Sequence, residues 1–333
     1  MNPPDPDWRP RADVGMLRTR AAVLQSARAF LSDRGLLEVD TPSLGEFGVT
    51  DPHIAGIPVR LSERPGQEYF LQTSPEYAMK RLLAAGCPDL YQIGKVFRDG
   101  ELGSRHQPEF TLAEWYRLGF SLDDMIDETC LFVASLFEAA GANAPDLPAD
   151  RYRYTDVFNR SIGIDPLTAD VTELRGAARQ CVTGISDELA RQLDADRNGW
   201  LDLLMSHVVI PGLTNNRLTI IHHYPAAQGA LARLDPEDER FAERFEAFYN
   251  GIELANGYRE LTDPEQQRAR FASDRRRRAA ANLADMRADE RLLAALDHGL
   301  PDCSGVAVGL DRVLMCAAGA ATINAVIALP LAD

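Results

Sequence analysis

Two strand-like runs joined by a charged loop occupy residues 90–117, which end in FRDGELGSRHQPEFTLAEWYR. Side chains alternate between the two faces of a strand, so residues two apart share a face. One face of each run carries the residues of interest: Gly94, Val96 and Arg98 in the first run, and Phe110, Leu112, Glu114 and Tyr116 in the second. The pattern predicts a hairpin that presents both apolar and charged side chains on one face of a sheet.

The residue types on that face suit the binding of charged small molecules. Arginine presents a planar fork that matches phosphate oxygens, so Arg98 is a candidate phosphate ligand. Phe110 can stack on a purine, and a carboxylate beside a tyrosine hydroxyl, as at Glu114 and Tyr116, can hold an ammonium group. The alternative is an amphipathic hairpin whose charged side chains only meet water.

Composition places the chain among globular proteins, because 333 residues with 45% hydrophobic content can bury a large core. No run of about 18 apolar residues occurs, and the start, MNPPDPDWRP, lacks the apolar centre of a signal peptide. We therefore expect a cytoplasmic protein without membrane contact. The five cysteines are odd in number and widely spaced, which predicts free thiols.

The charge balance argues against a polyanionic partner. Lys and Arg total 35 against 50 Asp and Glu, so the net charge is −15 and nucleic acid is not expected to be the main ligand. One basic run, Arg275–Arg278, lies in a polar helical stretch between Pro264 and Met286. It is either a local patch for an acidic partner or a solvated helix face, and the second interpretation is the simpler one.

Periodicity and turn residues predict the order of the remaining elements. Apolar residues recur at helical spacing after Asp13, a candidate N-cap, and Gly35 ends that helix. Further along we expect a short strand at 36–42 with Pro42 at an edge or bend, a helix at 75–85 capped by Ser74, a helix at 122–140, a Pro-rich charged linker at 144–156, an all-helical insertion at about 155–215 and a strand at 218–224.

A second hairpin is predicted at residues 243–260, ERFEAFYNGIELANGYRE, because Asn-Gly supplies the positive φ angles of a two-residue turn. With that turn, Ala247 pairs with Leu254, and Glu253 is the diagonal neighbour of Glu246. Two carboxylates so placed can converge on Mg²⁺, which binds one or two carboxylates plus substrate phosphates. The alternative is a solvent-exposed acidic hairpin. A bulge expected at Gly257 leaves the direction of the residues that follow open.

A third segment, residues 305–312, reads GVAVGLDR and predicts a strand that turns into a helix. Gly305, Ala307 and Gly309 fall on one face, where small side chains let a ligand lie against the backbone. Arg312 falls in the first helical turn, where its side chain and the free amides both favour a phosphate.

Together these segments resemble the three signature motifs of class II aminoacyl-tRNA synthetases over nearly the whole chain. The stretches that carry the resemblance are TSPEYAMKRLLAAG, FRDGELGSRHQPEFTLAEWYR, ERFEAFYNGIELANGYREL and GVAVGLDRVLM, which look like the active site of lysyl-tRNA synthetase. PDCSGVAVGLDR and GIELANGY are similar to its free-standing paralogues, which attach (R)-β-lysine to a lysine side chain of elongation factor P. The core begins near Val14, so no anticodon-binding domain is expected before it.

The resemblance implies an α+β fold, a six- or seven-stranded antiparallel sheet flanked by helices, in a homodimer formed through the first helix and the Pro42 strand. It also implies a two-step reaction with ATP and Mg²⁺. The carboxylate of (R)-β-lysine or lysine attacks the α-phosphorus to give an aminoacyl-adenylate, and an amine of elongation factor P then takes the aminoacyl group. Such chemistry depends on positioning and charge neutralisation, for which Arg98 and Arg312 are the candidate catalytic clamps.

Residue by residue, the resemblance implies two binding sets. The ATP set comprises Arg98, Asp99, Gly100, Glu101, His106, Gln107, Phe110, Glu246, Ala247, Gly309 and Arg312. Glu246 and Glu253 are the implied metal ligands. The amino acid set comprises Ser74, Pro75, Glu76, Glu114, Tyr116, Glu253, Asn256, Tyr258, Glu260 and Ala307. Carboxylates in the second set favour a substrate with two ammonium groups, although Glu76 could instead only complement its helix dipole.

Two positions depart from the lysyl-tRNA synthetase pattern. That pattern has Glu at the position of Gly100, so the adenine contact could pass to Glu101 or to backbone. It has Gly at the position of Ala307, where one methyl either reshapes the pocket for a β-amino acid or only packs. Two other functions stay open: a truncated lysyl-tRNA synthetase relative that charges tRNA or a small molecule, and a catalytically silent paralogue.

Overall fold

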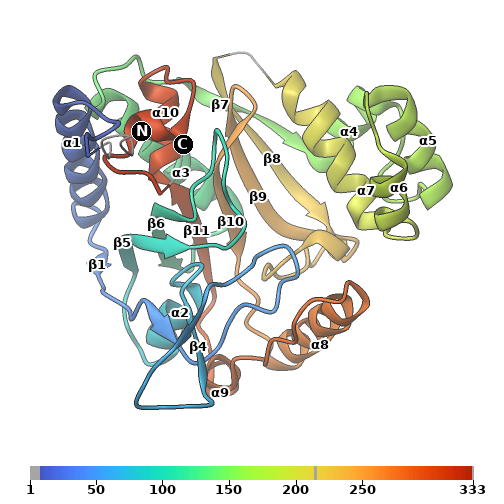
Figure 1. Ribbon diagram of the computed structural model, residues 1–333, viewed down its shortest axis with the longest axis horizontal. Coiled ribbons are helices and arrows are strands. Elements are labelled where there is room, and N and C mark those ends of the chain that lie inside the picture. The colour runs from blue at the N-terminus through green and yellow to red at the C-terminus, as the bar shows by residue number, and fades with distance from the viewer. Residues whose placement is uncertain (1–7, 214–215, 332–333) are drawn as a thin grey trace, which may run out of the picture.

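The computed structural model describes residues 8–213 and 216–331. Within them, one sheet of eight strands runs through the molecule in the order β1-β5-β6-β11-β10-β9-β8-β7 (Figure 1). Its strands are β1 (Leu37–Glu38), β5 (Leu90–Phe97), β6 (Glu109–Leu118), β7 (Asp146–Arg153), β8 (Arg217–Pro225), β9 (Phe241–Tyr249), β10 (Ile252–Arg259) and β11 (Cys303–Gly309). Neighbouring strands are antiparallel from β5 to β8, whereas β1 and β7 join in parallel at the two edges.

Two expectations about this sheet are wrong. It has more strands than the six or seven expected, in the part of the chain that the structure describes. The segment 144–156, expected to be a linker, supplies the edge strand β7, which pairs with β8. Its prolines and charges are tolerated because an edge strand leaves half of its backbone groups unpaired.

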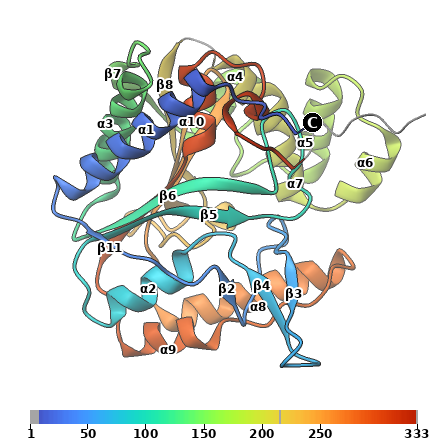
Figure 2. The same ribbon diagram turned by 60° about the vertical axis from the view of Figure 1, so that its left-hand side comes forward.

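Helices cover both faces of the sheet (Figure 2). The helices α1 (Val14–Ser32), α3 (Leu122–Ala139) and α10 (Leu310–Ala317) lie on one face, and α2 (Glu76–Ala84), α8 (Pro264–Ala280) and α9 (Glu290–His298) lie on the other. The main core forms beneath the first group, where Trp115 packs on Phe132 with ring centroids 4.8 Å apart. A smaller three-stranded sheet, β2 (Leu44–Gly45), β4 (Glu68–Leu71) and β3 (Pro58–Arg60), lies on the side of the second group.

The other α-helices follow β7 and precede β8 in the chain. They are α4 (Tyr154–Ile162), α5 (Val171–Cys181), α6 (Asp187–Leu193), α7 (Arg197–Leu204), the π-helix η1 (Met205–Val209) and the 3₁₀ turn η2 (Ile210–Gly212). Further 3₁₀ turns are η3 (Ala226–Gln228) and η4 (Ile323–Val326). The α4–η2 unit has its own core around Phe158, Leu174 and Trp200. The prediction that residues 155–215 are helical is confirmed for the described residues. That this unit is an insertion stays a prediction. Residues 214–215 lie outside the described part of the chain.

Local signals explain where the helices begin and end. Asp13 caps α1, since its carboxylate accepts a hydrogen bond from the Met16 backbone N–H at 2.8 Å. The helix ends at Ser32, and Gly35 continues the chain with a φ of 81°. At α2 the helix begins at Glu76 with Pro75 as its N-cap and no side-chain cap, so the prediction of Ser74 as the cap is wrong. The Ser74 hydroxyl instead accepts from the Glu76 backbone N–H at 3.1 Å, in the turn just before the helix.

Other expectations can be compared directly with the structure. All five cysteines are free thiols, as predicted. Among the described residues, no helix combines the length and apolar character needed to cross a bilayer. The basic run of α8 is not a uniformly solvated face, because Arg278 is buried and donates to the backbone carbonyls of Asp51 and Ala284. Neighbouring members of the run pair with carboxylates at the surface.

The β9–β10 hairpin has the predicted turn but a different register beyond it. Tyr249 pairs with Ile252 and Phe248 with Glu253, as expected. A bulge at Leu254 then pairs Ala247 with Ala255, so the predicted pairing of Ala247 with Leu254 is wrong, and the bulge precedes the position expected at Gly257. The extra residue places Leu254 in the core. The Phe248–Glu253 pair from which the diagonal placement of Glu246 and Glu253 was inferred is kept, so that placement stays a prediction.

Candidate active site

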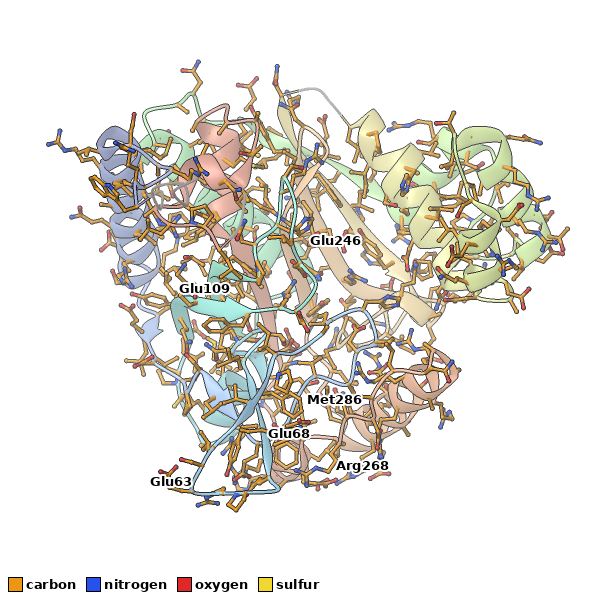
Figure 3. The ribbon with its side chains drawn as sticks, in the orientation of Figure 1. Glu63, Glu68, Glu109, Glu246, Arg268 and Met286 are labelled. Atoms are coloured by element: carbon orange, nitrogen blue, oxygen red, sulfur yellow. The ribbon has the colours of Figure 1, made fainter. Side chains whose placement is uncertain are left out.

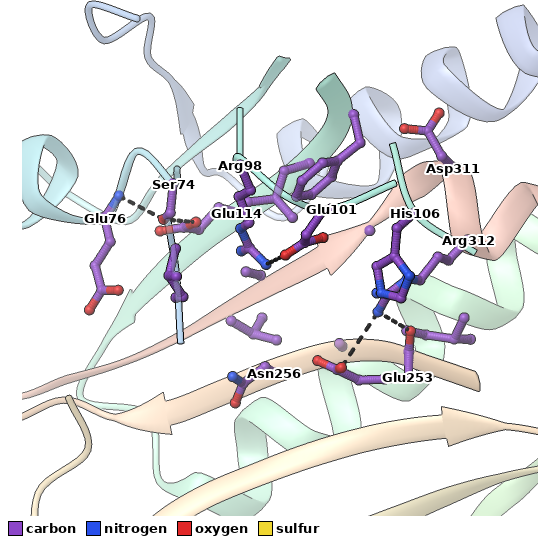
Figure 4. Close-up of a pocket in the computed structure, with 18 of the residues that line it drawn as sticks. Ser74, Glu76, Arg98, Glu101, His106, Glu114, Glu253, Asn256, Asp311 and Arg312 are labelled. Atoms are coloured by element: carbon purple, nitrogen blue, oxygen red, sulfur yellow. Dashed lines mark hydrogen bonds and ion pairs between the residues drawn. The ribbon is translucent and has the colours of Figure 1, made fainter. Parts of the chain in front are cut away.

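A cavity of about 170 Å³ opens over the middle of the sheet (Figure 4). Strands β6, β10 and β11 form its floor, and the starts of α2 and α10 supply its ends. Most of the predicted site residues line it: Ser74, Glu76, Arg98, Glu101, His106, Gln107, Phe110, Glu114, Tyr116, Glu253, Asn256, Tyr258, Glu260, Ala307, Gly309 and Arg312. The side-chain parity read from β6 is confirmed, because its four predicted residues all reach the cavity.

Five predicted residues do not line this cavity. Pro75 is buried at the start of α2, and Ala247 is buried in the main core. Asp99 and Gly100 are exposed in the turn after β5, where the Asp99 carboxylate accepts from the Gly100 backbone N–H. Glu246 lies on β9, where it pairs with Asn256 of the cavity wall, near the middle of the molecule (Figure 3).

The two predicted phosphate clamps approach the cavity from different elements. Arg98 follows the last residue of β5, and its guanidinium lies 5.1 Å from the centre of the Phe110 ring. Its Nε donates to the Thr73 carbonyl at 3.3 Å, and its Nη1 donates to Glu101 at 3.4 Å. The guanidinium is therefore held beside an aromatic ring that can stack on a purine.

Arg312 reaches the cavity from the first turn of α10. Its Nη1 donates to the Glu253 carbonyl at 3.0 Å, and its Nη2 lies 2.6 Å from Nε2 of His106. Burial, followed by the charge of Arg312, lowers the pKa of His106. A neutral imidazole can accept the Arg312 hydrogen bond, so the guanidinium is positioned by the loop between β5 and β6 and by strand β10.

A third group, Asp311, fixes the helix that carries Arg312. Its buried carboxylate accepts from the Thr111 backbone N–H at 2.6 Å and pairs with Arg20 of α1. Sequence reasoning missed Asp311, although its place beside Arg312 in the first turn of α10 was a signal for it. The contact ties α1, β6 and α10 together at the wall of the cavity, which Asp311 helps to line.

Acidic side chains gather at the other end of the cavity. Glu114 is buried on β6 and accepts hydrogen bonds from the Ser74 hydroxyl at 2.7 Å and the Tyr116 hydroxyl at 2.8 Å. Burial, with the nearby charge of Glu76, raises the pKa of Glu114 to about 7. A carboxyl held in this way can ionise fully when a cation arrives beside it.

Lys80 of α2 links the two other carboxylates of this end, and sequence reasoning missed it. Its Nζ lies 2.6 Å from Glu76 Oε1 and 2.5 Å from Glu260 Oε2, and all but 2% of the side chain is buried. Burial lowers the pKa of Lys80, but the charges of Glu260 and Glu76 outweigh burial and raise it above its ordinary value. The spacing of four residues from Glu76 within a predicted helix was the available signal.

Charge counting shows what this end of the cavity can accommodate. Three carboxylates and the one ammonium of Lys80 leave two negative charges when every group is ionised. Burial raises the pKa of Glu260 even beside Lys80, and Glu260 Oε1 has no hydrogen-bond partner among the described residues. Unpaired buried carboxylate oxygens are costly. The arrangement therefore suits a ligand with two ammonium groups.

Two small residues of β11, Gly305 and Ala307, leave space for a ligand at the acidic end of the cavity. A Cβ at Gly305 would lie 2.4 Å from the Tyr116 ring and 2.6 Å from Glu260 Oε1, so a side chain cannot fit there. Ala307 pairs with Glu114 on one side and Asn256 on the other, and it lines the cavity. Its methyl group thus lies between polar residues that would contact the same ligand.

Glu246 is engaged by other side chains. Its Oε2 accepts from the Tyr224 hydroxyl at 2.6 Å, and its Oε1 pairs with Arg244 on the same strand. Burial raises the pKa of Glu246, Arg244 lowers it, and the charge of Glu253 raises it further, so the two glutamates still interact. Arg244, two residues from Glu246 on β9, was also missed by sequence reasoning.

Comparisons with known proteins agree with this geometry. Residues 7–333 match the family described as tRNA synthetases class II (D, K and N). The chain belongs to this family. The class II synthetase fold expected from the sequence is therefore confirmed, and membership implies that the nucleotide is ATP.

Similar proteins of known role cover nearly the whole chain. An elongation factor P (R)-β-lysine ligase from Klebsiella pneumoniae (strain 342) is 46% identical over 325 residues, which make up 96% of each chain. Proteins of the same name from Haemophilus influenzae (strain PittGG) and Edwardsiella ictaluri (strain 93-146) are each 43% identical, again over 96% of each chain. This class II synthetase is thus similar to these relatives over nearly its whole length.

The raised pKa of Glu114 predicts a pH dependence. Below about pH 7 this carboxyl carries a proton, so it cannot neutralise an ammonium group. We expect kcat/KM for a diamino acid in ATP–pyrophosphate exchange to rise between about pH 6 and 8, and Glu114→Gln to flatten that rise. A wild-type profile that stays flat or falls over this interval would contradict the assignment.

Proposed function

We propose that this chain activates (R)-β-lysine or lysine with ATP as an aminoacyl-adenylate and transfers it to a lysine side chain of elongation factor P. The observation that carries the proposal is one cavity with two arginines at its nucleotide end and three carboxylates with Lys80 at its other end. The printed name of the relatives, matched over 96% of their length, supports the acceptor and the β-amino acid.

In the first step, the amino acid carboxylate attacks the α-phosphorus of ATP. The carboxylate oxygen forms the new bond to phosphorus, and pyrophosphate leaves with the electrons of the broken bond. Arg98 neutralises charge on the α-phosphate, and Arg312 holds the γ-phosphate at the far end. Phe110 stacks on adenine, while Glu101, His106, Gln107 and the backbone at Gly309 line the nucleotide path. Positioning and charge neutralisation supply most of the rate acceleration.

The acidic end selects the amino acid. Glu76, Glu114 and Glu260 neutralise two ammonium groups together with the hydroxyls of Tyr116 and Tyr258. Lys80 neutralises one of the three carboxylate charges, so the two negative charges that remain match two ammonium groups and not three. A neutral amino acid would leave buried carboxylates unpaired, which rejects it strongly. The Ala307 methyl shapes the floor of this pocket, where a β-amino acid places its amine one carbon further from the carboxylate.

In the second step, the acceptor amine attacks the activated carbonyl. The amine nitrogen bonds to the carbonyl carbon, the bond from that carbon to the phosphate oxygen breaks, and AMP leaves with the electron pair. The protons lost by the attacking ammonium group pass to water. An amide bond on a protein lysine is the product, and AMP and pyrophosphate are the by-products.

Magnesium fits this site through Glu253 better than through Glu246. Glu253 lines the cavity beside Arg312, whereas both oxygens of Glu246 are already engaged by Tyr224 and Arg244. No group of three or more potential metal ligands occurs among the described residues. Mg²⁺ held by one carboxylate plus phosphate oxygens needs no such group. When bound, the ion would neutralise phosphate charge, and Glu246 would act through Arg244 and Glu253.

This difference between the two glutamates is testable. Glu253→Gln is expected to raise the Mg²⁺ concentration for half-maximal ATP–pyrophosphate exchange by about tenfold, as loss of one carboxylate ligand should. Glu246→Gln is expected to change that concentration less, since it removes no ligand. Titrating Mg²⁺ at saturating ATP separates the two. An equal or larger effect of Glu246→Gln would restore the predicted two-carboxylate metal site.

The predicted homodimer through α1 and the strand before Pro42 stays part of the proposal. Val14 of α1 and Leu37 of β1 are exposed apolar side chains on that side, which supports an interface there. Sedimentation equilibrium of the purified protein tests it, and a monomer at micromolar concentration would contradict it.

Mass spectrometry tests the proposed function as a whole. Purified elongation factor P is incubated with the protein, Mg²⁺·ATP and (R)-β-lysine, and the intact mass is measured. The expected result is a gain of one lysyl group on one lysine of the acceptor. Aminoacylation of tRNA without modification of elongation factor P would instead support a tRNA-charging relative, and no ATP–pyrophosphate exchange with any diamino acid would support a catalytically silent paralogue.

A further inference from the structure

A second and larger cavity, of about 640 Å³, adjoins the first. It lies between the loop at residues 44–56, α2, η3 and α8 on the α8 and α9 side of the sheet. Asn198 of the α4–η2 unit also contributes to its wall. Nothing in the two-step reaction described so far uses most of its lining residues.

The two cavities meet at a defined place. Five residues line both of them: Ile54, Ser74, Glu76, Arg98 and Tyr258. Arg98 is the α-phosphate clamp, and Glu76 belongs to the amino acid end, so the junction lies where the activated carbonyl joins the phosphate. The acidic end itself is closed, because Tyr116 and Glu260 are buried. The nucleotide fills the opposite end, between Phe110 and Arg312.

We propose that the acceptor lysine of the partner protein reaches the adenylate through this second cavity, a proposal that rests on the proposed function. The second cavity meets the first beside Arg98 and Glu76, where the proposed reaction places the activated carbonyl carbon that the amine must attack. An acceptor that entered from the nucleotide end would have to pass the adenosine and phosphate of the bound adenylate. The class of ligand is an extended aliphatic chain that ends in a primary amine, with the adjoining peptide.

The lining of the second cavity suits such a chain. Apolar side chains form much of the wall: Leu44, Phe47, Val49, Ile54, Phe70, Leu71, Ala78, Ala226, Ala230 and Leu231. A lysine side chain buries its methylene groups along such a surface and keeps its amine polar.

Several charged residues around this wall are already matched by neighbours. Arg277 pairs with Asp274 at 2.7 Å, and Arg291 pairs with Glu46 at 2.7 Å. Asp274 also accepts from the Thr50 hydroxyl at 2.9 Å. Because these charged side chains bind one another, the apolar part of the wall can contact the methylene groups of a lysine side chain. The polar groups that the amine meets are those of the junction, Ser74 and Glu76.

Tryptophan on α8 tests this route. Ser273 lines the second cavity but not the first, whereas its neighbour Ala272 is exposed and lines neither. Ser273→Trp is expected to lower kcat/KM for modification of elongation factor P at least about tenfold, because an amine held away from the carbonyl reacts slowly. ATP–pyrophosphate exchange should stay within twofold of wild type. Ala272→Trp, the matched control, should change neither rate by more than twofold.

Two additional measurements keep the test decisive. Ala227→Trp blocks the cavity from η3 instead of α8 and is expected to give the same split between exchange and transfer. Hydroxylamine, a small nucleophile, should still release the aminoacyl group from both variants, which shows that the adenylate forms. Unchanged transfer in both variants, or equal loss of exchange and transfer, would overturn the route. Absence of exchange or transfer in the wild-type protein would instead refute the proposed function.

Discussion

Replacing Arg98 with alanine is expected to slow amino-acid-dependent ATP–pyrophosphate exchange by about 10²- to 10³-fold, the cost typical of losing one donor to developing charge. Arg98 is held by the Thr73 carbonyl, Glu101 and the Phe110 ring, so its guanidinium is positioned before the substrates arrive. The loss should appear mainly in kcat, because the clamp acts on charge that develops in the transition state.

The controls separate catalysis from folding. Arg98→Lys retains the charge but loses the planar fork, so its rate should lie between those of wild type and Arg98→Ala. Arg60→Ala removes an exposed arginine of β3 that lies 4.0 Å from Glu68, and it should be near wild type. Thermal unfolding of each variant shows whether the fold is retained. A folded Arg98→Ala protein with exchange within fivefold of wild type would contradict the phosphate-clamp role.

The second large effect is expected at Glu260. Changing Glu260 to glutamine should lower kcat/KM for lysine or (R)-β-lysine by about 30- to 700-fold, since truncating one partner of a buried charge pair costs about 2 to 4 kcal/mol. Discrimination against norleucine, which lacks the second amine, should fall at the same time. In the variant, norleucine leaves one fewer buried carboxylate without an ammonium partner, so its binding is penalised less.

A surface carboxylate supplies the control for this change. Glu109 lies on β6, the strand that also carries Glu114, and pairs with Lys95 at 3.2 Å in solvent. Glu109→Gln should leave activity within twofold of wild type, as exposed ion pairs contribute little. Glu260→Gln should lose selectivity as well as rate. A proportionate loss for lysine and norleucine would mean that Glu260 supports the fold rather than the choice of substrate.

The parts of the site that were predictable from sequence rest on short-range rules. Alternation along β6 placed Phe110, Glu114 and Tyr116 on one face because the β5–β6 pairing runs without interruption. The same rule placed Gly305 and Ala307 on the cavity face of β11. In these strands the local backbone is regular, so residue spacing carries over directly into position.

The parts that were not predictable depend on distant or irregular contacts. A bulge at Leu254 shifted the pairing of β9 with β10, and spacing alone does not show where an extra residue enters a strand. The edge strand β7 is held by β8, from which it is separated by the α4–η2 helices. Lys80 is buried because Glu260, far along the chain, neutralises it together with Glu76. No local pattern reveals that pair.

ATP–pyrophosphate exchange measured with (R)-β-lysine, lysine and norleucine tests the central claim most directly. The claim is that a pair of arginines grips a triphosphate beside a slot whose net charge fits two ammonium groups. We expect exchange with one or both diamino acids and a rate with norleucine lower by at least about 10⁴-fold. Equal exchange with norleucine, or none with any of the three while the protein is folded, would contradict it.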